Sequence, residues 1–385
     1  MRRLAIFREC LLPGSETFIR TQARALKGWQ PTLLGLRRAV NGLSLDDLPH
    51  RIIEDRTGVG YPVTSAITYL ANRPHLGLVR ALHAISADVV HVHFGVDAVR
   101  AWPSVRATGV PMLVTLHGYD ICVRRDWWES GAGGWRRRFY PERLMKMAHH
   151  PTVSFVAVSE AIRQRALEWG IPSEKIAVSY IGVDVDGLVF ADKPMASRPN
   201  RILFVGRMVE KKAPLLLLRA FAKVRLQVPD AELVFVGDGP LLPEVVALAG
   251  RMGVPIQTLG IRPWADVKRL MREARAFCLP SVTARNGDAE GLPTVLLEAM
   301  ASGVPVVTSA QGGVGEAVRH LETGIAFPEG DEAELASHLA RLLANPALGQ
   351  ALAASARKHV ERNFRIEACA ESFEALLDRH AERFS

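Results

Sequence analysis

Two glutamates flank the start of a predicted helix in the stretch 277–309, FCLPSVTARNGDAEGLPTVLLEAMASGVPVVTS. Gly291-Leu292-Pro293 opens this helix, and the backbone N–H groups and the dipole at such a start suit an anion such as phosphate. Because carboxylates repel phosphate, Glu290 and Glu298 are expected to accept hydrogen bonds from hydroxyl groups instead. A ligand with a diphosphate between a ribose and a sugar meets both demands. The alternative is a pair of exposed helix glutamates without a ligand.

A basic turn supports the ligand hypothesis. Gly206-Arg207 and Lys211-Lys212 follow a short apolar strand and precede a predicted helix. Arg207 and Lys212 at the carboxyl end of a strand can neutralise a diphosphate without a metal. A solvated basic turn is the alternative. The nearby Gly237-Asp238-Gly239-Pro240 predicts a tight turn, but it lacks the small residues that the G-x-G-x-x-G dinucleotide motif needs.

Histidines end two strands in the first half of the chain. His91 and His93 share one strand face, but the sequence places no third ligand near them, which favours packing or hydrogen bonding over metal binding. His117, before Gly118 at the end of the next strand, is the better candidate for chemistry. Near the N-terminus, Gly14 lies in a turn that opens a helix, where a ligand can approach the backbone closely. A core histidine and an ordinary helix cap are the respective alternatives.

Short apolar runs alternate with amphipathic segments and predict an α/β fold of two doubly wound parallel sheets. The predicted strands are Leu4–Arg8, Val89–His93, Met112–Thr115, Ser154–Ala157, Ile176–Tyr180, Ile202–Val205, Glu232–Val236, Phe277–Pro280 and Pro305–Thr308. Predicted helices between the later strands are Pro214–Leu226, Leu241–Met252 and Ala265–Ala274. In such sheets, ligands bind at the carboxyl ends of the strands.

The domain prediction has three parts. A linker is expected at 186–200, where the apolar pattern weakens. It separates an N-terminal Rossmann-like domain, 1–190, that binds the acceptor from a C-terminal Rossmann-like domain, 191–365, that binds the donor. The segment 344–384 is expected to be helical without a further strand, and its last part, 366–385, to pack back on the N-terminal domain.

Together these motifs resemble the retaining glycosyltransferases of family four, which adopt the GT-B fold of two facing Rossmann-like domains with the active site in the cleft. The resemblance runs from about Arg3 to the C-terminal helix, and its most specific part is Ser281 to Glu298. The other motifs are Gly206-Arg207 with Lys211-Lys212, Gly237-Asp238-Gly239-Pro240, Gly312-Gly313-Val-Gly-Glu316, and Ser179-Tyr-Ile-Gly182-Val-Asp184. Ser15-Glu16-Thr17-Phe18 and Ser281-Val-Thr-Ala look most like bacterial exopolysaccharide and capsule transferases of the colanic acid and amylovoran type.

The resemblance implies a role for each matching residue. Arg207 and Lys212 would hold the donor diphosphate and stabilise its departure. Glu290 would position the donor sugar, and Glu298 would accept hydrogen bonds from the ribose hydroxyls. His117 would lie against the transferred sugar from the other domain. The remaining implied contacts are Gly14 near the diphosphate and acceptor, the backbone from Gly291 through Leu292 and Pro293 to Thr294 at the donor, and Ile261 and Arg262 beside the nucleobase.

The implied reaction moves a hexose from a UDP or GDP sugar with retention of the anomeric configuration. The family's favoured mechanism is same-face substitution, in which the leaving diphosphate oxygen takes the acceptor proton. The protein's task is then positioning and charge stabilisation. Arg207 and Lys212 would replace Mg²⁺, so neither a metal nor another cofactor is expected. Ala213 stands where the family has a glycine, and Ser179-Tyr-Ile replaces its Pro-Asn-Gly, but neither change removes a charged group.

The charge distribution points to the acceptor. The chain has 385 residues and a net charge of +8, and residues 1–198 hold the whole excess, with 26 Lys and Arg against 18 Asp and Glu. A basic aromatic segment, defined by Trp127, Trp128, Trp135, Arg136, Arg137 and Arg138, suits anionic headgroups. Nucleic acid could use the same side chains but is not the expected partner, and a plain basic loop is the other alternative.

The expected acceptor is therefore a polyprenyl-diphosphate-linked glycan for exopolysaccharide, capsule or lipopolysaccharide. Four scattered cysteines favour a reducing cytosol, and no apolar run is long enough to span a bilayer, so a cytoplasmic protein peripheral on the inner leaflet of the plasma membrane is expected. Rival functions are a sugar-nucleotide epimerase of GT-B fold and a non-catalytic sugar-nucleotide binding protein. A dinucleotide oxidoreductase is disfavoured by the missing glycine motif.

Overall fold

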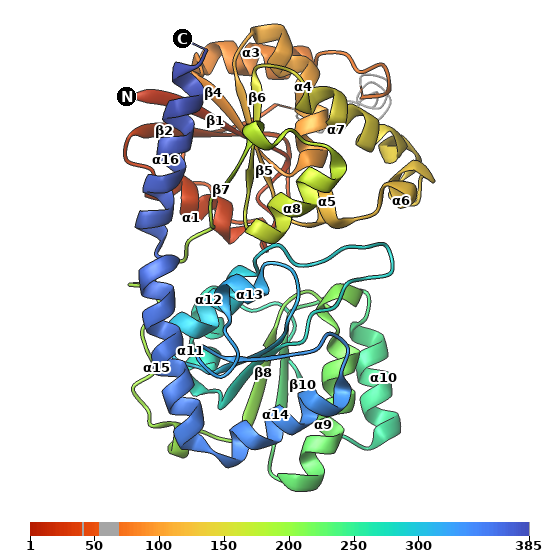
Figure 1. Ribbon diagram of the computed structural model, residues 1–385, viewed down its shortest axis with the longest axis vertical. Helices are drawn as coiled ribbons and strands as arrows, with labels where there is room; N and C mark the ends of the chain where they lie inside the picture. Colours follow the sequence, from red (N-terminus) through yellow and green to blue (C-terminus); the bar gives the residue numbers. More distant parts are fainter. Residues whose placement is uncertain (41, 54–68, 385) are drawn as a thin grey trace. The chain divides into compact units, whose positions relative to one another are not determined.

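A computed structural model describes residues 1–40, 42–53 and 69–384 (Figure 1). The chain divides into two compact units, the first formed by Met1–Gly182 with Ile366–Ser385 and the second by Val183–Arg365. Each unit contains one parallel β-sheet with helices packed on it. This is the α/β architecture that the strand and helix alternation predicts.

The first unit is built on a seven-stranded sheet with the order β3-β2-β1-β4-β5-β6-β7. Its central strands are apolar and buried along their whole length, as in β4 (VVHVH) and β5 (MLVTL), because helices cover both faces of a parallel sheet. The strands are β1 (Arg2–Leu11), β2 (Trp29–Arg38), β3 (His50–Ile52), β4 (Val89–His93), β5 (Met112–Leu116), β6 (Val153–Ala157) and β7 (Ile176–Val178).

The helices of the first unit alternate with these strands. They are α1 (Thr17–Ala25), α3 (Leu76–Ile85), α4 (Gly95–Thr108), α5 (Tyr119–Cys122), α6 (Arg125–Glu129), α7 (Tyr140–Ala148), α8 (Glu160–Trp169) and α16 (Ile366–Glu382), with 3-10 helices η1 (Trp135–Phe139) and η2 (Ser173–Lys175). Local sequence sets several of their ends: Ser159 caps α8 by accepting from the backbone N–H of Ile162, and Gly170 ends it in the left-handed conformation.

The C-terminal helix α16 packs on the first unit beside α1 and β4 (Figure 1). Phe373 and Leu377 are buried in the core of this unit, and the Phe373 ring lies 4.8 Å from the His91 ring, measured between centroids. The Glu374 carboxylate accepts from the backbone N–H groups of Lys27, at 2.7 Å, and Gly28, at 2.6 Å. A segment remote in sequence thereby closes the core beside β1.

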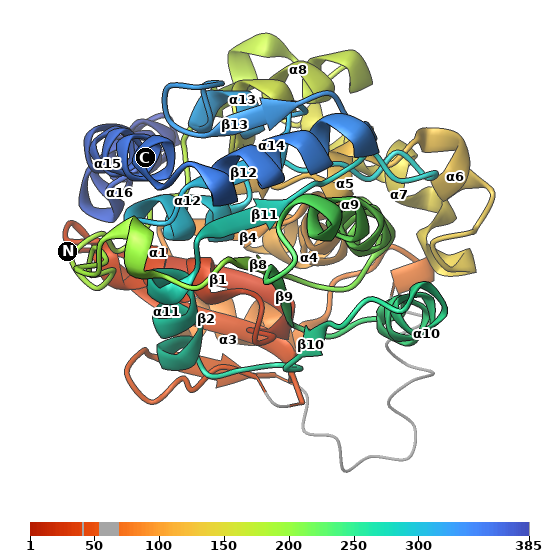
Figure 2. The ribbon, with the colours of Figure 1, turned by 90° about the horizontal axis from the view of Figure 1, so that it is seen from below.

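The second unit is built on a six-stranded sheet with the order β10-β9-β8-β11-β12-β13. Helix α9 packs against α10 and α14, and α14 also covers β11, β12 and β13 (Figure 2). The strands are β8 (Arg201–Val205), β9 (Glu232–Val236), β10 (Gln257–Thr258), β11 (Ala276–Leu279), β12 (Val306–Ser309) and β13 (Ile325–Phe327). The helices are α9 (Pro214–Gln227), α10 (Leu242–Met252), α11 (Trp264–Glu273), α12 (Thr294–Ala301), α13 (Val314–Ala317), α14 (Glu332–Ala344) and α15 (Pro346–Asn363), with η3 (Met195–Ser197) and η4 (Glu210–Lys212).

The segment 186–200 is not a linker between units, which corrects the prediction. It belongs to the second unit and packs into it. The Arg198 side chain is 2% exposed and donates to the carbonyls of Ala274, at 3.1 Å, and Gly303, at 3.0 Å. The weak apolar pattern misled the prediction because a few apolar side chains of this segment, Leu188, Ala191 and Met195, are buried together with the hydrogen-bonded arginine.

In each sheet, strands are added first on one side of the starting strand and later on its other side. In the first sheet β1 is flanked by β2 and β4, and in the second β8 is flanked by β9 and β11. At such a switch point the loops that leave neighbouring strands diverge, which opens a binding crevice at the carboxyl edge of the sheet. The loops after β8 and β11 carry the basic turn and Glu290, and the loops after β1 and β4 carry Gly14 and the residues that follow His93.

Candidate functional site

In the second unit, the loops that follow β8 and β11 are joined by backbone contacts at the switch point. The backbone N–H of Val282 donates to the carbonyl of Lys211 at 2.7 Å, and that of Arg285 donates to the Glu210 carboxylate at 3.2 Å. These bonds bring together the two motifs that the sequence places far apart, the basic turn and the glutamate before α12. We call the set Arg207, Lys211, Lys212, Ser281, Asp288 and Glu290 the switch-point cluster.

Lys212 and Glu290 form the centre of this cluster. The Lys212 ammonium lies 2.6 Å from Oε1 of Glu290, and their side chains are 12% and 7% exposed. The Ser281 hydroxyl donates to the same oxygen at 3.0 Å. Burial acts to raise the pKa of Glu290, but the charges of Lys212 and Lys211 and these two hydrogen bonds outweigh it and lower the pKa to about 2. Glu290 is therefore ionised throughout the neutral range.

The other two cations lie beside this pair. The Lys211 ammonium lies 3.0 Å from the Asp288 carboxylate, and both side chains are largely buried. The Arg207 side chain is exposed and interacts electrostatically with both lysines. Each carboxylate is thus matched by a lysine, and Arg207 adds a further positive charge at the surface. A solvent-facing surplus of positive charge at the carboxyl edge suits an anionic ligand.

Two glycines allow the backbone to pack closely around the cluster. At Gly237, with φ of +124°, a Cβ would lie 2.1 Å from the carbonyl oxygen of Gly206. At Gly312, with φ of +52°, a Cβ would lie 2.4 Å from the carbonyl oxygen of Glu290. Both positions need the conformational freedom and small size of glycine. The Gly-Asp-Gly-Pro and Gly-Gly motifs in the sequence therefore have a steric role at the edge of this site.

Helix α12 begins at Thr294, and Pro293 is its N-cap residue rather than a residue of its first turn. Gly291, Leu292 and Pro293 are buried, so what this segment offers at the start of α12 is backbone. Glu298 lies on the second turn of α12, half-buried. Burial raises the pKa of Glu298 to about 7. Its carboxylate is thus only partly ionised at neutral pH, unlike that of Glu290.

This difference predicts a pH-dependent nucleotide affinity. If Glu298 accepts hydrogen bonds from ribose hydroxyls, as the family resemblance implies, its ionised form is the stronger acceptor, so the affinity for a nucleotide diphosphate should fall as the pH drops from 8 to 6. In Glu298→Gln the affinity at pH 8 should be about tenfold weaker and should fall less between pH 8 and 6 than in the wild type, because a neutral amide replaces the ionised acceptor and only the terminal phosphate of the nucleotide, with a pKa of about 6, still titrates. Calorimetric titration across this range measures both. An equal loss of affinity between pH 8 and 6 in the wild type and the variant would contradict the role.

The folding stability of the same variant gives a second test of the raised pKa of Glu298. The unfolded chain ionises Glu298 near its usual pKa of 4.5, whereas the folded chain does so only near 7, so folding stability falls as the pH rises between these values. Glu298→Gln should therefore unfold at a higher temperature than the wild type at pH 8, with a gain of about 1–3 kcal/mol, and show a smaller difference at pH 5. A lower melting temperature at pH 8 would contradict the burial argument.

The residues predicted beside the nucleobase lie two strands from the centre of the cluster. Ile261 is 80% exposed and Arg262 is exposed, just after the edge strand β10. The backbone N–H of Gly237 donates to the carbonyl of Gly260 at 2.9 Å, which ties this segment to the loop after β9. Their contact with a base stays a prediction.

In the first unit, the three histidines gather at the carboxyl ends of β4 and β5. Nδ1 of His93 lies 3.0 Å from Nε2 of His117, and the His91 ring accepts or donates a hydrogen bond at 2.8 Å with the Thr115 hydroxyl. Burial, followed by the neighbouring charges, holds the pKa of His93 and of His117 well below the usual value. Both rings are therefore neutral near pH 7. Across the described residues, no group of three or more His, Cys, Asp or Glu side chains is arranged to hold a metal ion.

Asp120 positions the backbone around His117. Its carboxylate accepts from the backbone N–H groups of His117, at 3.1 Å, Gly118, at 3.0 Å, and Gly95, at 2.8 Å. Asp120 is fully buried and joins the end of β5 to the start of α4. Sequence reasoning did not assign it a role, although its position three residues after His117 is a recognisable signal for a turn-capping aspartate. Ser281, which orients Glu290, was likewise quoted within a motif without a role.

The structure contradicts the predicted membrane contact of one residue in the basic aromatic segment, Trp128. Trp128 is fully buried and packs against Tyr119, Tyr140 and Trp127, so it cannot contact a membrane. It is a core residue of the first unit. Trp135 is 58% exposed, and Arg136 and Arg138 of η1 are exposed as well. Trp127 and Arg137 are half-buried, and Gly14 is exposed in the loop after β1.

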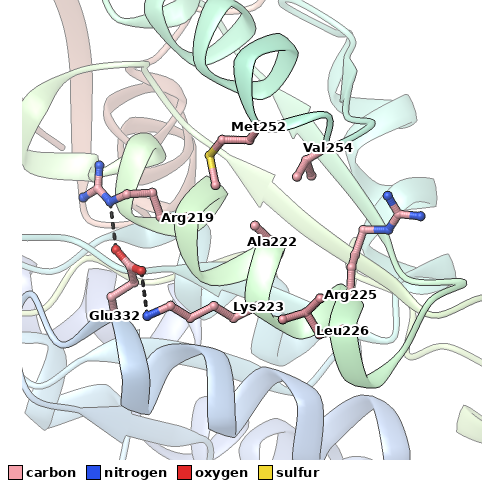
Figure 3. Close-up of a pocket in the computed structure, with 8 residues that line it drawn as sticks. All are labelled: Arg219, Ala222, Lys223, Arg225, Leu226, Met252, Val254 and Glu332. Atoms are coloured by element: carbon pink, nitrogen blue, oxygen red, sulfur yellow. Dashed lines mark hydrogen bonds and ion pairs between the residues drawn. The ribbon is translucent and has the colours of Figure 1, made fainter.

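A pocket on the second unit lies apart from the switch-point cluster. It is lined by Arg219, Ala222, Lys223, Arg225 and Leu226 of α9, by Met252 and Val254, and by Glu332 of α14 (Figure 3). The Glu332 carboxylate lies 2.8 Å from Nε of Arg219 and 2.9 Å from Nζ of Lys223, so it forms ion pairs with both cations. None of the predicted site residues lines this pocket, and it is not a candidate donor site.

Comparison with known proteins agrees with the fold and the motifs. Residues 14–186 match the model of Glycosyltransferase Family 4, and residues 189–359 match that of the group 1 glycosyl transferases. The amylovoran biosynthesis glycosyltransferase AmsK of Erwinia amylovora is 31% identical over 300 residues, which span 77% of this chain and 71% of AmsK. The putative colanic acid biosynthesis glycosyltransferase WcaL of Salmonella typhimurium is 30% identical over 76% of this chain and 70% of WcaL.

Solved structures show the same architecture. Anabaena HepE, in its complex with UDP and glucose, superposes with a TM-score of 0.80 at 18% identity, over 98% of this chain and 99% of HepE. Sucrose-phosphate synthase from Thermosynechococcus elongatus superposes with a TM-score of 0.78 at 20% identity, over 98% of this chain and 99% of that one. Two Rossmann-like parallel-sheet units with these neighbours define the GT-B fold. The chain belongs to glycosyltransferase family 4.

Proposed function

We propose that this glycosyltransferase is a retaining, metal-independent hexosyltransferase that moves a sugar from a nucleotide-diphosphate donor to a lipid-linked oligosaccharide. The observation that carries the proposal is the switch-point cluster, where Arg207 and Lys212 lie at the carboxyl edge between β8 and β11 and Lys211 is paired with Asp288. Positive charge at this place suits the diphosphate of a donor. The HepE structures hold UDP, UDP with glucose, and UDP-glucose, which supports a nucleotide sugar as the donor class.

In this proposal the protein acts by positioning and by stabilising charge. As the bond between the sugar and the diphosphate breaks, negative charge builds up on the leaving oxygen, and preorganised cations stabilise that charge. A lysine ammonium has three N–H donors, so Lys212 can bind Glu290 and a phosphate oxygen together. Side-chain cations supply the charge that Mg²⁺ supplies in other transferases, so transfer should persist in excess EDTA.

The carboxylates near His117 favour same-face substitution over a mechanism with a covalent glycosyl-enzyme intermediate. Asp120 accepts three backbone N–H groups, and Glu16 and Asp97 both bind the Arg8 guanidinium. These carboxylates are occupied as hydrogen-bond acceptors and are poorly placed to attack a sugar. The proposal then gives His117 the role of binding the transferred sugar. Product analysis by NMR, reading the anomeric configuration, tests retention directly.

The deciding experiment is calorimetric titration with UDP and GDP, followed by a screen of donor sugars on the nucleotide that binds. Binding of one nucleotide and acceptor-dependent turnover of one of its sugars would support the proposal. Turnover of the donor without any acceptor would favour an epimerase instead. Absence of binding to both nucleotides would contradict it.

We further propose the acceptor and its location. AmsK and WcaL are named for amylovoran and colanic acid synthesis, which supports a role in bacterial exopolysaccharide synthesis, with capsule or lipopolysaccharide as the wider class. The proposed acceptor is a polyprenyl-diphosphate-linked glycan at the inner leaflet of the plasma membrane. Among the described helices, none is long and apolar enough to cross a membrane. Contact with the lipid would then come from exposed side chains.

The exposed residues of the basic aromatic segment are predicted to make this contact with the membrane lipid. Trp135, Arg136 and Arg138 protrude from η1, where cations bind anionic headgroups and an indole inserts at the interface. Replacing Arg136, Arg137 and Arg138 with alanine should reduce binding to vesicles with 30% anionic lipid by about 100-fold, at about 1 kcal/mol per arginine. Sedimentation measures the binding, and neutral vesicles are the control. Equal binding of both proteins to anionic vesicles would contradict the contact.

A further inference from the structure

A buried arginine lies at the switch point of the first sheet. Arg8, near the end of β1, is 9% exposed, and its guanidinium contacts three other elements. Its Nε and Nη2 atoms bind the Glu16 carboxylate side by side, at 2.9 and 2.5 Å. Its Nη1 atom binds the Asp97 carboxylate and lies 3.4 Å from the carbonyl oxygen of His93. One side chain thus ties β1 to the turn before α1, to α4 and to the end of β4.

This arginine also touches the surroundings of His117. The Arg8 guanidinium lies over the Phe94 ring, 4.4 Å from its centroid, and the Phe94 ring lies 4.4 Å from the His117 ring, between centroids. His93, whose carbonyl faces Arg8, has its ring nitrogen 3.0 Å from that of His117. Two intermediate residues, Phe94 and His93, therefore connect the guanidinium to His117 by direct contacts.

The backbone at Phe94 shows that this arrangement is held against a local preference. Phe94 has φ of +71°, which a residue other than glycine rarely adopts. Its N–H donates to the carbonyl of Thr115 at 2.9 Å, and its ring is covered by Arg8. Strained backbone persists where the surroundings over-determine it, and such positions concentrate at functional sites. Here the strained residue is the one that packs between Arg8 and His117.

A contribution to folding stability is by itself a weak explanation for the ion group of Arg8, Glu16 and Asp97. Two buried carboxylates around one guanidinium carry a large desolvation cost, and apolar residues of similar volume often stabilise a fold as well or better. The planar guanidinium offers what apolar residues cannot, a fork that fixes two carboxylates in defined directions. Glu16 is the last residue before α1 and follows the exposed Gly14, so this fork also sets the loop after β1.

We propose that Arg8 is a positioning residue for sugar transfer: through Glu16, Phe94 and His93 it holds the Gly14 loop and the His117 ring in their working places. This inference rests on the proposed function, because it takes His117 to bind the transferred sugar. Arg8 itself acts through its neighbours. Its loss should lower the rate of transfer while leaving nucleotide binding on the second unit unchanged.

The test uses Arg8→Lys, which keeps the charge but loses the fork, on the full chain with the donor found in the nucleotide-sugar screen. We expect kcat to fall 10- to 100-fold, with the Kd for the nucleotide within twofold of the wild type. The ring ¹⁵N signals of His117, assigned with His117→Gln, should shift. Arg275→Lys is the matched control, since Arg275 is a 6% exposed arginine of the second unit that binds backbone carbonyls. It should lower the melting temperature and leave kcat within twofold.

Glu16→Gln provides a second variant if Arg8→Lys does not fold. It keeps one oxygen acceptor for Arg8, and kcat should fall three- to tenfold with the same unchanged nucleotide affinity. An unaltered kcat, an unaltered His117 signal, or a parallel loss of kcat and nucleotide affinity would overturn the inference. A wild-type protein that binds neither UDP nor GDP would contradict the proposed function instead, and the ¹⁵N measurement on Arg8→Lys would still test the positioning of His117.

Discussion

Replacing Lys212 with methionine will reduce the rate of sugar transfer by about 10³-fold, the range seen when a preorganised charge-stabilising group is removed from an active site. Lys212 is a largely buried cation that we assign to the leaving diphosphate, and Glu290 holds its ammonium at 2.6 Å. Methionine fills a similar volume without charge, so the change removes the electrostatic interaction with little loss of packing. Steady-state kinetics with the donor found in the screen measures the effect.

The adjacent lysine supplies a matched control. Lys211 is also largely buried and also pairs with a carboxylate, that of Asp288, so Lys211→Met leaves a comparable unpaired charge. We expect both variants to unfold at lower temperatures than the wild type, but Lys211→Met should retain at least a tenth of the transfer rate. If the two variants lose the same amount of activity, the loss reports disruption of the loop and not a specific role for Lys212.

Glu290→Gln will lower kcat by about 10²-fold and change nucleotide affinity much less. With a pKa of about 2 the Glu290 carboxylate is fully ionised at neutral pH, so it holds the Lys212 ammonium in place by charge as well as by a hydrogen bond. Glutamine keeps the shape and one acceptor oxygen but removes the charge. The sequence-based prediction had Glu290 position the donor sugar, and the ion pair adds that it also positions Lys212.

A double-mutant cycle separates these two roles. If Glu290 acts through Lys212, the double variant of Glu290→Gln and Lys212→Met should be nearly as active as Lys212→Met alone, because the two changes remove one shared function. Independent roles would make the losses multiply. Wild-type rates in both Glu290→Gln and Glu298→Gln would contradict the assignment of this edge of the sheet as the donor site.

Most of the sheet could be predicted because buried parallel strands have a simple local pattern. Apolar runs such as ELVFV at β9 and VVHVH at β4 are predicted with the bounds that the structure has. The long strand β2 was missed, although it is paired on both sides, with β1 and with the short edge strand β3. Its sequence, WQPTLLGLRR, contains Pro31 and Gly35, which normally argue against a strand.

Tertiary contacts explain that exception. A Cβ at position 35 would lie 2.8 Å from the Cβ of Leu11 on the neighbouring strand, so Gly35 allows the close approach of β1 and β2. The short strands β3, β10 and β13 were also missed, since two or three residues carry too little periodicity to be recognised. The segment 186–200 was misjudged for a related reason, because its buried Leu188, Ala191, Met195 and Arg198 are held by tertiary contacts within the second unit.

Residue types at strand ends were enough to identify the family, and they underlie the proposed diphosphate site. The basic turn after β8, the two glutamates around α12 and the histidine after β5 are local patterns, each at the carboxyl end of a strand. Their order and spacing carried the resemblance to family four, which the family models and relatives then showed. Local patterns suffice here because the chemistry of a diphosphate needs particular residue types.

The partners of those residues were decided only by the tertiary structure. Nothing in the sequence pairs Lys212 with Glu290 or Lys211 with Asp288, and reversing the two pairings would leave every motif unchanged. The same holds for Arg8, which resembles any polar residue near a strand end until Glu16, Asp97 and Phe94 surround it. Burial converts these contacts into defined charges and directions, because a buried ionisable group must be matched by partners that the fold brings from distant parts of the chain.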